Sequence, residues 1–207
     1  MELFDEAVLF ATKKHSGQRR KGNNAPYILH PLEAAAIVGT MTDNQETLAA
    51  TVLHDTIEDT DTTIEEIREA FGKRVALLVL TETEDKRPGI PEEQTWKIRK
   101  QETLAILAMT KDDAVRMMWL GDKLSNMRSF FQLHIREGDA MWNHFNQKDP
   151  SMQLWYYNTL LEYLSPLKHF DAYKELKMLT SAVFVSTQEA QLSHDIVSFF
   201  ALGQSEF

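Results

Sequence analysis

The sequence predicts an all-α protein folded as a single compact domain. Apolar residues recur at spacings of three and four along most of its 207 residues, which is the period of a helix with one buried face. Strict alternation of apolar and polar residues, the mark of a half-buried strand, is absent from the sequence. With 43% hydrophobic and 26% charged residues, a chain of this length can bury one substantial core. We therefore expect a bundle of about nine or ten helices.

The first two helices are indicated by the residues at their ends. The first is expected at about residues 2–15, because Gly17 follows its apolar stripe as a terminator. The second is expected in the segment HPLEAAAIVGTM, because Pro31 suits a first helical position, where its missing N–H needs no partner. This assignment places His30 at the start of the second helix.

The third helix is expected from about Gln45 to Glu58, with Asp43 or Asn44 as its cap. Thr62, followed three residues later by Glu65, has the pattern of a capping box that opens the next helix. Further helices are expected from there to Gly72 and at about residues 74–84, 94–109, 112–131, 139–147, 151–164 and 171–187.

One long connection is rich in helix breakers: DKRPGIPEEQ, residues 85–94. A lid over a site and a mobile loop are both open for it, because long loops are often but not always functional. We expect the folded domain to cover residues 1–187 and a C-terminal helix or tail to cover residues 188–207. This tail could pack on another subunit, which leaves a homo-oligomer open.

Composition limits the classes of partner. The net charge of −9 and the pI of about 5.3 exclude a general basic surface for nucleic acid or an anionic membrane. A polyanionic ligand must therefore be held by a local cluster, such as Arg19-Arg20-Lys21. The chain has no cysteine, no basic leader and no apolar stretch of the roughly 20 residues that span a bilayer. We expect a soluble cytoplasmic protein.

Four polar side chains gather in the segment LHDTIEDT, residues 53–60. In a helix, Glu58 lies one turn after His54 and Asp59 one turn after Asp55, on two adjoining faces. Singly, each residue fits a helix end or a solvated surface. Together they indicate a site, because burying this many ionisable groups costs several kcal/mol unless a cation or partners compensate.

Two more residues can complete a metal site. His30 stands between apolar neighbours, and Asp122 interrupts an apolar helix in MMWLGDKLSNMR, where a lone aspartate is costly unless it is paired or coordinated. With His54 and Asp55 they form a set of two nitrogen and two carboxylate ligands. Such a set suits one divalent ion such as manganese, iron or zinc, with positions left for water and substrate.

The motifs HSGQRRKGNNAPYILHPLEAA, VLHDTIEDT, FGKRVALLV and LGDKLSNMRS resemble, in order and spacing, those of the HD-superfamily hydrolase domain of RelA/SpoT-type alarmone enzymes. The match is closest to the stand-alone small alarmone hydrolases and covers roughly residues 3–180. It implies an all-helical domain that binds one manganese ion and removes the 3′-pyrophosphate of ppGpp and pppGpp. By this resemblance the metal ligands are His30, His54, Asp55 and Asp122.

The resemblance also implies roles in substrate binding. Glu58 and Asp59 would position or activate the attacking water. The following residues would contact the nucleotide: Arg20 and Lys21 through guanine and phosphate, Lys123 through phosphate, Asn126 one turn after the last metal ligand, and Tyr156 as a C-terminal aromatic.

Two residues depart from the family pattern. Trp119 replaces a cation, which predicts weaker or reorganised binding of the outer phosphates. Gly121 within a helix costs up to about 1 kcal/mol against alanine and is expected to leave room for a bulkier group near the metal. Two alternatives therefore stay open: a phosphohydrolase of another nucleotide, such as an NADPH 2′-phosphatase, and a catalytically silent nucleotide sensor.

Overall fold

The computed structural model describes residues 1–20, 22 and 24–187, and within them the fold is all-α, as predicted. The regular elements are α1 (Leu3–Lys14), α2 (Leu29–Val38), α3 (Gln45–Leu53), α4 (Thr56–Asp59), α5 (Ile64–Leu80), α6 (Glu92–Met109), α7 (Asp113–Glu137), α8 (Pro150–Tyr163) and α9 (Asp171–Val183), with short 3-10 helices at Gly138–His144 and Ser165–Leu167. The expected C-terminal segment, residues 188–207, lies outside the described residues. None of the helices in the described part of the chain is long and apolar enough to cross a membrane.

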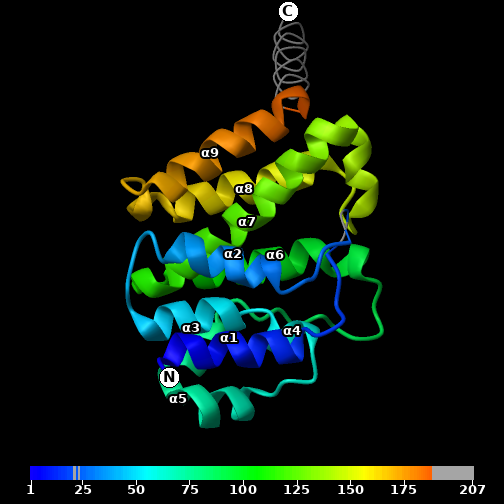
Figure 1. Cartoon of the computed structure of the whole chain (residues 1–207). Coiled ribbons are helices and arrows are strands. Elements are labelled where there is room, and N and C mark those ends of the chain that lie inside the picture. Colours follow the sequence, from blue (N-terminus) through cyan, green and yellow to red (C-terminus); the bar gives the residue numbers. More distant parts are fainter. Residues whose placement is uncertain (21, 23, 188–207) are drawn as a thin grey trace, which may run out of the picture.

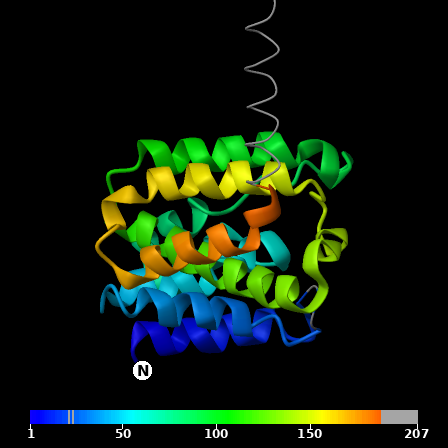
Figure 2. The same cartoon turned by 90° about the horizontal axis from the view of Figure 1, so that it is seen from above.

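The helices are stacked in layers around α7 (Figures 1 and 2). In Figure 1, α5 lies at one end of the stack, next to α1 and α3, and α8 and α9 lie at the other end. The 25-residue helix α7 runs between these ends and packs against α2, α3 and α9. Because α7 is in contact with helices from both ends of the stack, a residue in its middle lies deep in the molecule.

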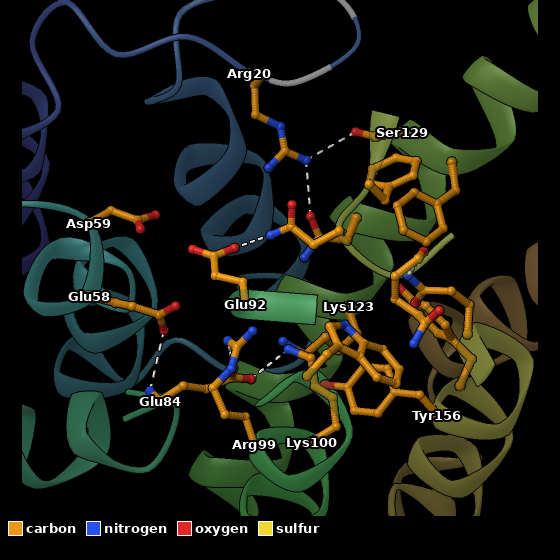
Figure 3. Close-up of a pocket in the computed structure, with 18 of the residues that line it drawn as sticks. Arg20, Glu58, Asp59, Glu84, Glu92, Arg99, Lys100, Lys123, Ser129 and Tyr156 are labelled. Atoms are coloured by element: carbon orange, nitrogen blue, oxygen red, sulfur yellow. Dashed lines mark hydrogen bonds and ion pairs between the residues drawn. The ribbon is translucent and has the colours of Figure 1, made fainter. Parts of the chain in front are cut away.

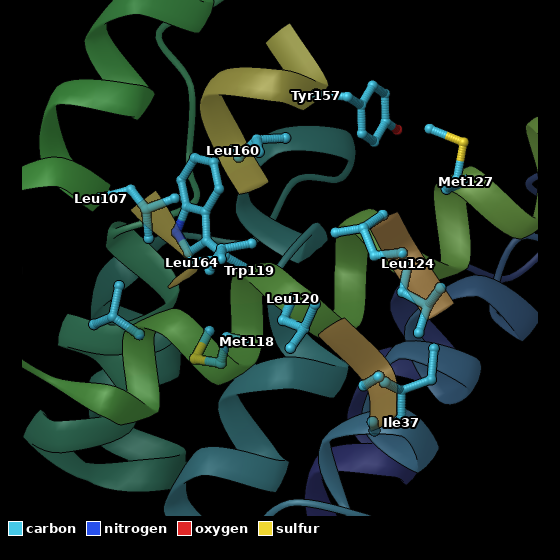
Figure 4. Close-up of a cluster of buried hydrophobic side chains, with 14 of the residues drawn as sticks. Ile37, Leu107, Met118, Trp119, Leu120, Leu124, Met127, Tyr157, Leu160 and Leu164 are labelled. Atoms are coloured by element: carbon cyan, nitrogen blue, oxygen red, sulfur yellow. The ribbon is translucent and has the colours of Figure 1, made fainter. Parts of the chain in front are cut away.

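The core surrounds the middle of α7, where residues 118–122 are buried on all sides of the helix. Figure 4 shows the indole of Trp119 near Leu107 of α6 and Leu160 of α8. Trp119 is 1% exposed, and Leu120 is fully buried beside it. Burial of a large apolar side chain contributes on the order of 1.5–3 kcal/mol, so this stretch fixes α7 in place.

The predicted continuous helix over residues 45–58 is wrong, because the chain leaves regular helix at His54 and Asp55. Two side chains take the carbonyls that a helix would use at this point. The Nδ1 atom of His54 lies 2.7 Å from the carbonyl oxygen of Thr51, and the Thr56 hydroxyl donates to the carbonyl of Leu53 at 2.7 Å. Such bonds compete with the helical ladder, and here they separate α3 from α4.

Most other helix ends lie within about four residues of the predictions, but α7 runs to Glu137 and not to about residue 131. Asn44 caps α3 by accepting from the Thr47 amide at 2.9 Å, as predicted. Pro31 is the third residue of α2 and not the first, which still leaves its missing N–H in the first turn. The helix predicted at 139–147 is wrong in type, because this segment forms a 3-10 helix.

The start of α5 lies one residue later than predicted. The capping box is formed by Thr63 and Glu66, and not by Thr62 and Glu65. Gly72 adopts φ +89°, a conformation that favours glycine, and it interrupts the helix as predicted.

The close approach of α2 to α7 occurs at Gly121. A Cβ atom at this position would lie 2.6 Å from Cγ2 of Val38 and 2.8 Å from the carbonyl oxygen of Ala34. The expected space for a bulkier group is therefore absent, because α2 fills it. Gly121 serves the packing of the two helices that hold His30 and Asp122.

We expect Gly121→Ala to lower the free energy of unfolding by about 1–3 kcal/mol, since the added methyl group overpacks the α2–α7 contact. Chemical denaturation measures this change. Adding Val38→Ala removes one of the two clashes and should recover part of the loss, and a strictly additive double mutant would contradict the proposed contact.

Candidate metal and active site

Four predicted ligand residues meet at the centre of the stack. His30 comes from the start of α2, His54 and Asp55 from the break between α3 and α4, and Asp122 from the middle of α7. The Nε2 atoms of His30 and His54 lie 3.0 and 3.6 Å from Asp122 Oδ1, and 3.6 and 3.0 Å from Asp55 Oδ2. Ligand atoms of His30, His54 and Asp122, all buried, lie within 4.8 Å of one another. Asp55 contacts this group from the more exposed side.

Hydrogen bonds at the outer ring nitrogens fix how the two imidazoles are presented. The carbonyl of Thr51 can only accept, so the Nδ1 atom of His54 carries a proton. Ser125 lies 2.8 Å from Nδ1 of His30 and donates its own proton to Glu33 at 2.7 Å, so Nδ1 of His30 is a donor too. Both Nε2 atoms therefore face the centre, and that of His54 is buried without a hydrogen bond in the described structure.

A cation fits this donor set. Burial lowers the pKa of His54, but the carboxylates of Asp55 and Asp122 raise it by more, so its net pKa is well above the ordinary value. Burial also lowers the pKa of His30, and there it dominates. The carboxylates thus favour a positive charge at Nε2 of His54, and in the absence of an ion a proton supplies it. A divalent ion would take the place of this proton, because metal ligands must be deprotonated.

The two carboxylates have further partners. Tyr27 donates to Asp55 at 2.6 Å, Asn126 donates to Asp122 at 2.6 Å, and the Lys123 ammonium contacts Oδ2 of Asp122. Burial raises the pKa of both carboxyl groups, but the neighbouring imidazoles and, at Asp122, the ammonium lower it by more, to below the usual range. Both groups are therefore anionic, and their hydrogen bonds fix the direction of the carboxylates.

The acid pair lies on α4, at the edge of this centre. Burial, followed by the charges of Asp55 and Glu84, raises the pKa of Glu58 to about 7. Lys86 lowers this pKa, and its Nζ atom lies 3.5 Å from Glu58 and 2.6 Å from Asp59. The two acids therefore differ: Glu58 is poised to exchange a proton near neutral pH, and Asp59 is held in an ion pair.

Gln18 fixes the backbone of the acid pair. Its side-chain amide donates to the carbonyl of Asp59 at 2.6 Å, and its oxygen lies 2.8 Å from Nδ1 of His15. The position of α4 is thus set from α1 as well as from α3.

A pocket of about 390 Å³ opens beside the acid pair (Figure 3). Figure 3 shows Glu58 and Asp59 on one side and Lys100, Lys123 and Tyr156 on the opposite side. Six cationic side chains line it: Arg19, Arg20, Lys86, Arg99, Lys100 and Lys123.

Four of the predicted substrate residues line this pocket: Arg20, Lys123, Asn126 and Tyr156. Arg20 donates to Asn126 at 3.0 Å, and Asn126 donates in turn to Asp122, so hydrogen bonds connect the pocket with the buried carboxylate. The hydroxyl of Tyr156 is buried and has no hydrogen-bond partner among the described residues. Lys21 lies outside the described residues, so its predicted role stays a prediction.

Several pocket residues were not found from the sequence. Arg99 and Lys100 of α6 bind Glu84 at 2.6 and 2.5 Å, and Lys100 lies 5.3 Å from the ring centre of Tyr156. Lys86, the partner of Asp59, belongs to the predicted breaker-rich connection. In the sequence, Lys86, Arg99 and Lys100 stand among other charged residues, as residues of an exposed surface do, so nothing indicated that their side chains point into a pocket.

Glu82 is a further buried acid that the sequence analysis missed. Both of its carboxylate oxygens are buried without a hydrogen-bond partner in the described structure. Burial, followed by the charge of Asp122, raises its pKa to about 8. The signal in the sequence was an acid directly after the apolar run LLVLT.

Comparisons with known proteins agree with the motifs. The model of the HD domain family matches residues 7–149. A guanosine-3′,5′-bis(diphosphate) 3′-pyrophosphohydrolase of Aquifex aeolicus is 42% identical over 130 residues, which are 63% of this chain and 18% of that protein. A GTP pyrophosphokinase rsh of Brucella ovis is 37% identical over 127 residues, 61% of this chain and 17% of that protein. The chain thus spans less than a fifth of the length of these curated relatives.

Two solved structures share the fold. One is a metazoan orthologue of SpoT that hydrolyses ppGpp and plays a role in starvation responses; it is 25% identical, with a TM-score of 0.67 over 90% of this chain and 96% of that one. The other is a protein of Listeria monocytogenes, 28% identical, with a TM-score of 0.65 over 75% and 98% of the two chains. The resemblance drawn from the motifs is therefore confirmed.

We expect His54→Ala and Asp122→Asn to lose a bound divalent ion, because a gap in the ligand shell of a buried site is poorly filled by water. Elemental analysis of the folded, purified variants measures this loss. His144→Ala is the control, since His144 binds Glu137 at the surface. Full metal content in either site variant would show that the ligand set is wrong.

Proposed function

The chain belongs to the HD domain family, and we propose that it is a metal-dependent hydrolase that removes the 3′-pyrophosphate of ppGpp or pppGpp to leave GDP or GTP. One observation supports this most: two buried histidines and two aspartates adjoin a pocket lined by six cationic and four acidic side chains, a local excess of positive charge in a protein with a net charge of −9. A substrate rich in phosphate groups suits this local excess. The activities given for the Aquifex relative and the SpoT orthologue agree with this proposal.

We propose His30, His54, Asp55 and Asp122 as the ligands of one divalent ion, with manganese as the ion. Nitrogen and carboxylate ligands together suit a borderline to hard ion of this kind. The ion would supply charge stabilisation at a phosphoryl oxygen and would lower the pKa of water at the site.

The residues of the chain would supply proton transfer and positioning. Glu58, with a pKa of about 7, accepts the proton of the attacking water, and Asp59 orients that water. The water oxygen forms a bond to the phosphorus next to the ribose, the bond from that phosphorus to the 3′ oxygen breaks, and the 3′ oxygen takes up a proton. Pyrophosphate leaves, while Lys123, Lys100 and Arg99 offset its charge.

Arg20 would hold the base. Its guanidinium is 5.8 Å from the ring centre of Tyr27 and donates to Asn126, so it presents one planar face at the pocket wall. Stacking on such a face suits guanine. Tyr156 and Asn126 would complete the contacts with the nucleotide, together with Lys21.

The NADPH alternative depended on Trp119 in place of a cation. Trp119 is in the core and does not line the pocket, so the structure offers no observation in its favour. In the silent-sensor alternative, Glu58 and Asp59 take no part in a reaction. That alternative leaves unexplained why the pKa of Glu58 is raised to about 7. Both alternatives remain as outcomes of the following test.

We expect purified protein loaded with manganese to release pyrophosphate from ppGpp and to leave GDP. Ion-exchange chromatography of the products measures this directly. Monophosphate release from NADPH at a much higher kcat/KM would instead establish the NADPH phosphatase. No release from either substrate by metal-loaded protein would establish the silent sensor.

We expect kcat to fall as the pH drops below the pKa of Glu58, since only its deprotonated form can accept a proton. Lys86 lowers this pKa, so Lys86→Met should move the acidic limb of the pH–kcat profile to higher pH. Lys97→Met, on the exposed side of α6, is the control and should leave the limb in place. Glu58→Gln should reduce kcat by roughly two orders of magnitude or more. An unchanged limb in Lys86→Met would contradict the assignment of Glu58 as the base.

A further inference from the structure

A continuous chain of hydrogen bonds runs outward from His30, away from the pocket. The Nδ1 atom of His30 lies 2.8 Å from the hydroxyl of Ser125, and this hydroxyl donates to Oε2 of Glu33 at 2.7 Å. His30 is 4% exposed and Ser125 is fully buried, so water does not compete for the first bond. The direction is fixed, because a carboxylate accepts and a hydroxyl that donates to it is left to accept from the imidazole.

The chain of hydrogen bonds continues to α9. Arg128 donates to Oε1 of Glu33 at 3.0 Å and forms two bonds, of 2.7 and 2.8 Å, with the carboxylate of Glu175. Glu33 thus accepts from Ser125 with one oxygen and from Arg128 with the other. An acid fixed at both oxygens cannot turn away from Ser125 without losing a charge-assisted bond.

The spacing of these residues explains how they meet. Glu33 lies three residues after His30 on α2, and Ser125 and Arg128 follow Asp122 at spacings of three on α7. Residues three apart share a face of a helix, so these two faces are turned toward each other. The close approach of α2 and α7 at Gly121 brings the faces within hydrogen-bond distance.

We infer that Ser125 and Glu33 are positioning residues that hold the imidazole of His30 in the tautomer that can bind a divalent ion. With the proton fixed on Nδ1, Nε2 is the nitrogen that faces the centre of the site beside Asp122, where its lone pair would bind the ion. Without the carboxylate, the Ser125 hydroxyl is free to donate to Nδ1, which moves the imidazole proton to Nε2 and blocks coordination. Arg128 and Glu175 extend this support to α9.

This inference rests on the proposed metal centre but not on the identity of the substrate. The test is the affinity of metal-free protein for Mn²⁺, measured by calorimetric titration. We expect Ser125→Ala and Glu33→Gln each to weaken binding by about 10- to 100-fold, as is typical for partners of metal-bound histidines. Ser129→Ala is the matched control. Ser129 lies one turn further along α7, and its hydroxyl accepts from Arg20 and donates to the backbone carbonyl of Ser125, but it does not contact His30 or Glu33, so Mn²⁺ affinity should be unchanged.

A second measurement reports the tautomer itself. In ¹⁵N NMR spectra of the metal-free protein, His30 should have the Nδ1–H form in wild type and gain the Nε2–H form in Glu33→Gln. If Ser125→Ala fails to fold, Glu33→Gln decides the question, because the Glu33 side chain is 38% exposed and tolerates an isosteric change.

The outcomes separate two kinds of failure. If wild-type protein binds no Mn²⁺, the proposed metal centre is wrong, and this inference falls with it. If wild type binds and both variants bind equally well with an unchanged tautomer, the centre stands and only the positioning role is wrong. Weaker binding in both variants, with wild-type affinity in Ser129→Ala, supports the inference.

Discussion

The buried carboxylate of Asp122 is the constraint on which the rest of the structure depends. A lone acid 3% exposed in the middle of a core helix is costly, so the fold must supply groups that stabilise its charge. Three elements do so: α2 presents His30, the break after α3 presents His54, and the next turns of α7 present Lys123 and Asn126. His30 can reach Asp122 because glycine at position 121 lets α2 approach α7 closely.

Local cations resolve the apparent conflict between an acidic protein and the polyanionic substrate that we propose for it. The net charge of −9 repels anions over long distances, but screening limits this effect to roughly 8–10 Å at physiological salt. Inside the pocket the balance is different, because Arg99 and Lys100 share one acid, Glu84, and each keeps donors for a ligand. The acid holds the two cations at a fixed separation. A ligand phosphate therefore meets a preorganised pair.

The sequence predicted the helices well, and the four residues that it proposed as metal ligands lie together in the structure, because both depend on local spacing. His54 and Asp55 are adjacent, and His30 and Asp122 stand out as polar residues among apolar neighbours, so each has a signal within a few positions. The break at His54 and the capping box at Thr63 escaped prediction, because they depend on which of several nearby polar side chains bonds to a given carbonyl or amide. Lys86, Arg99 and Lys100 escaped for another reason: their inward direction is set by tertiary contacts with Asp59 and Glu84, which no spacing in the sequence reveals.

Trp119, at the position where the motif resemblance leads one to expect a cation, is a neighbour of Lys123 and does not line the pocket. The Lys123 ammonium lies 5.0 Å from the centre of the Trp119 ring, one helical turn away, and it contacts Asp122 on its other side. An aromatic face attracts an ammonium ion, and more strongly where water is excluded. A second cation at position 119 would instead repel Lys123 at this distance. Tryptophan therefore leaves one ammonium beside Asp122 and helps to fix its position. This ammonium also faces the pocket and lies near Glu82.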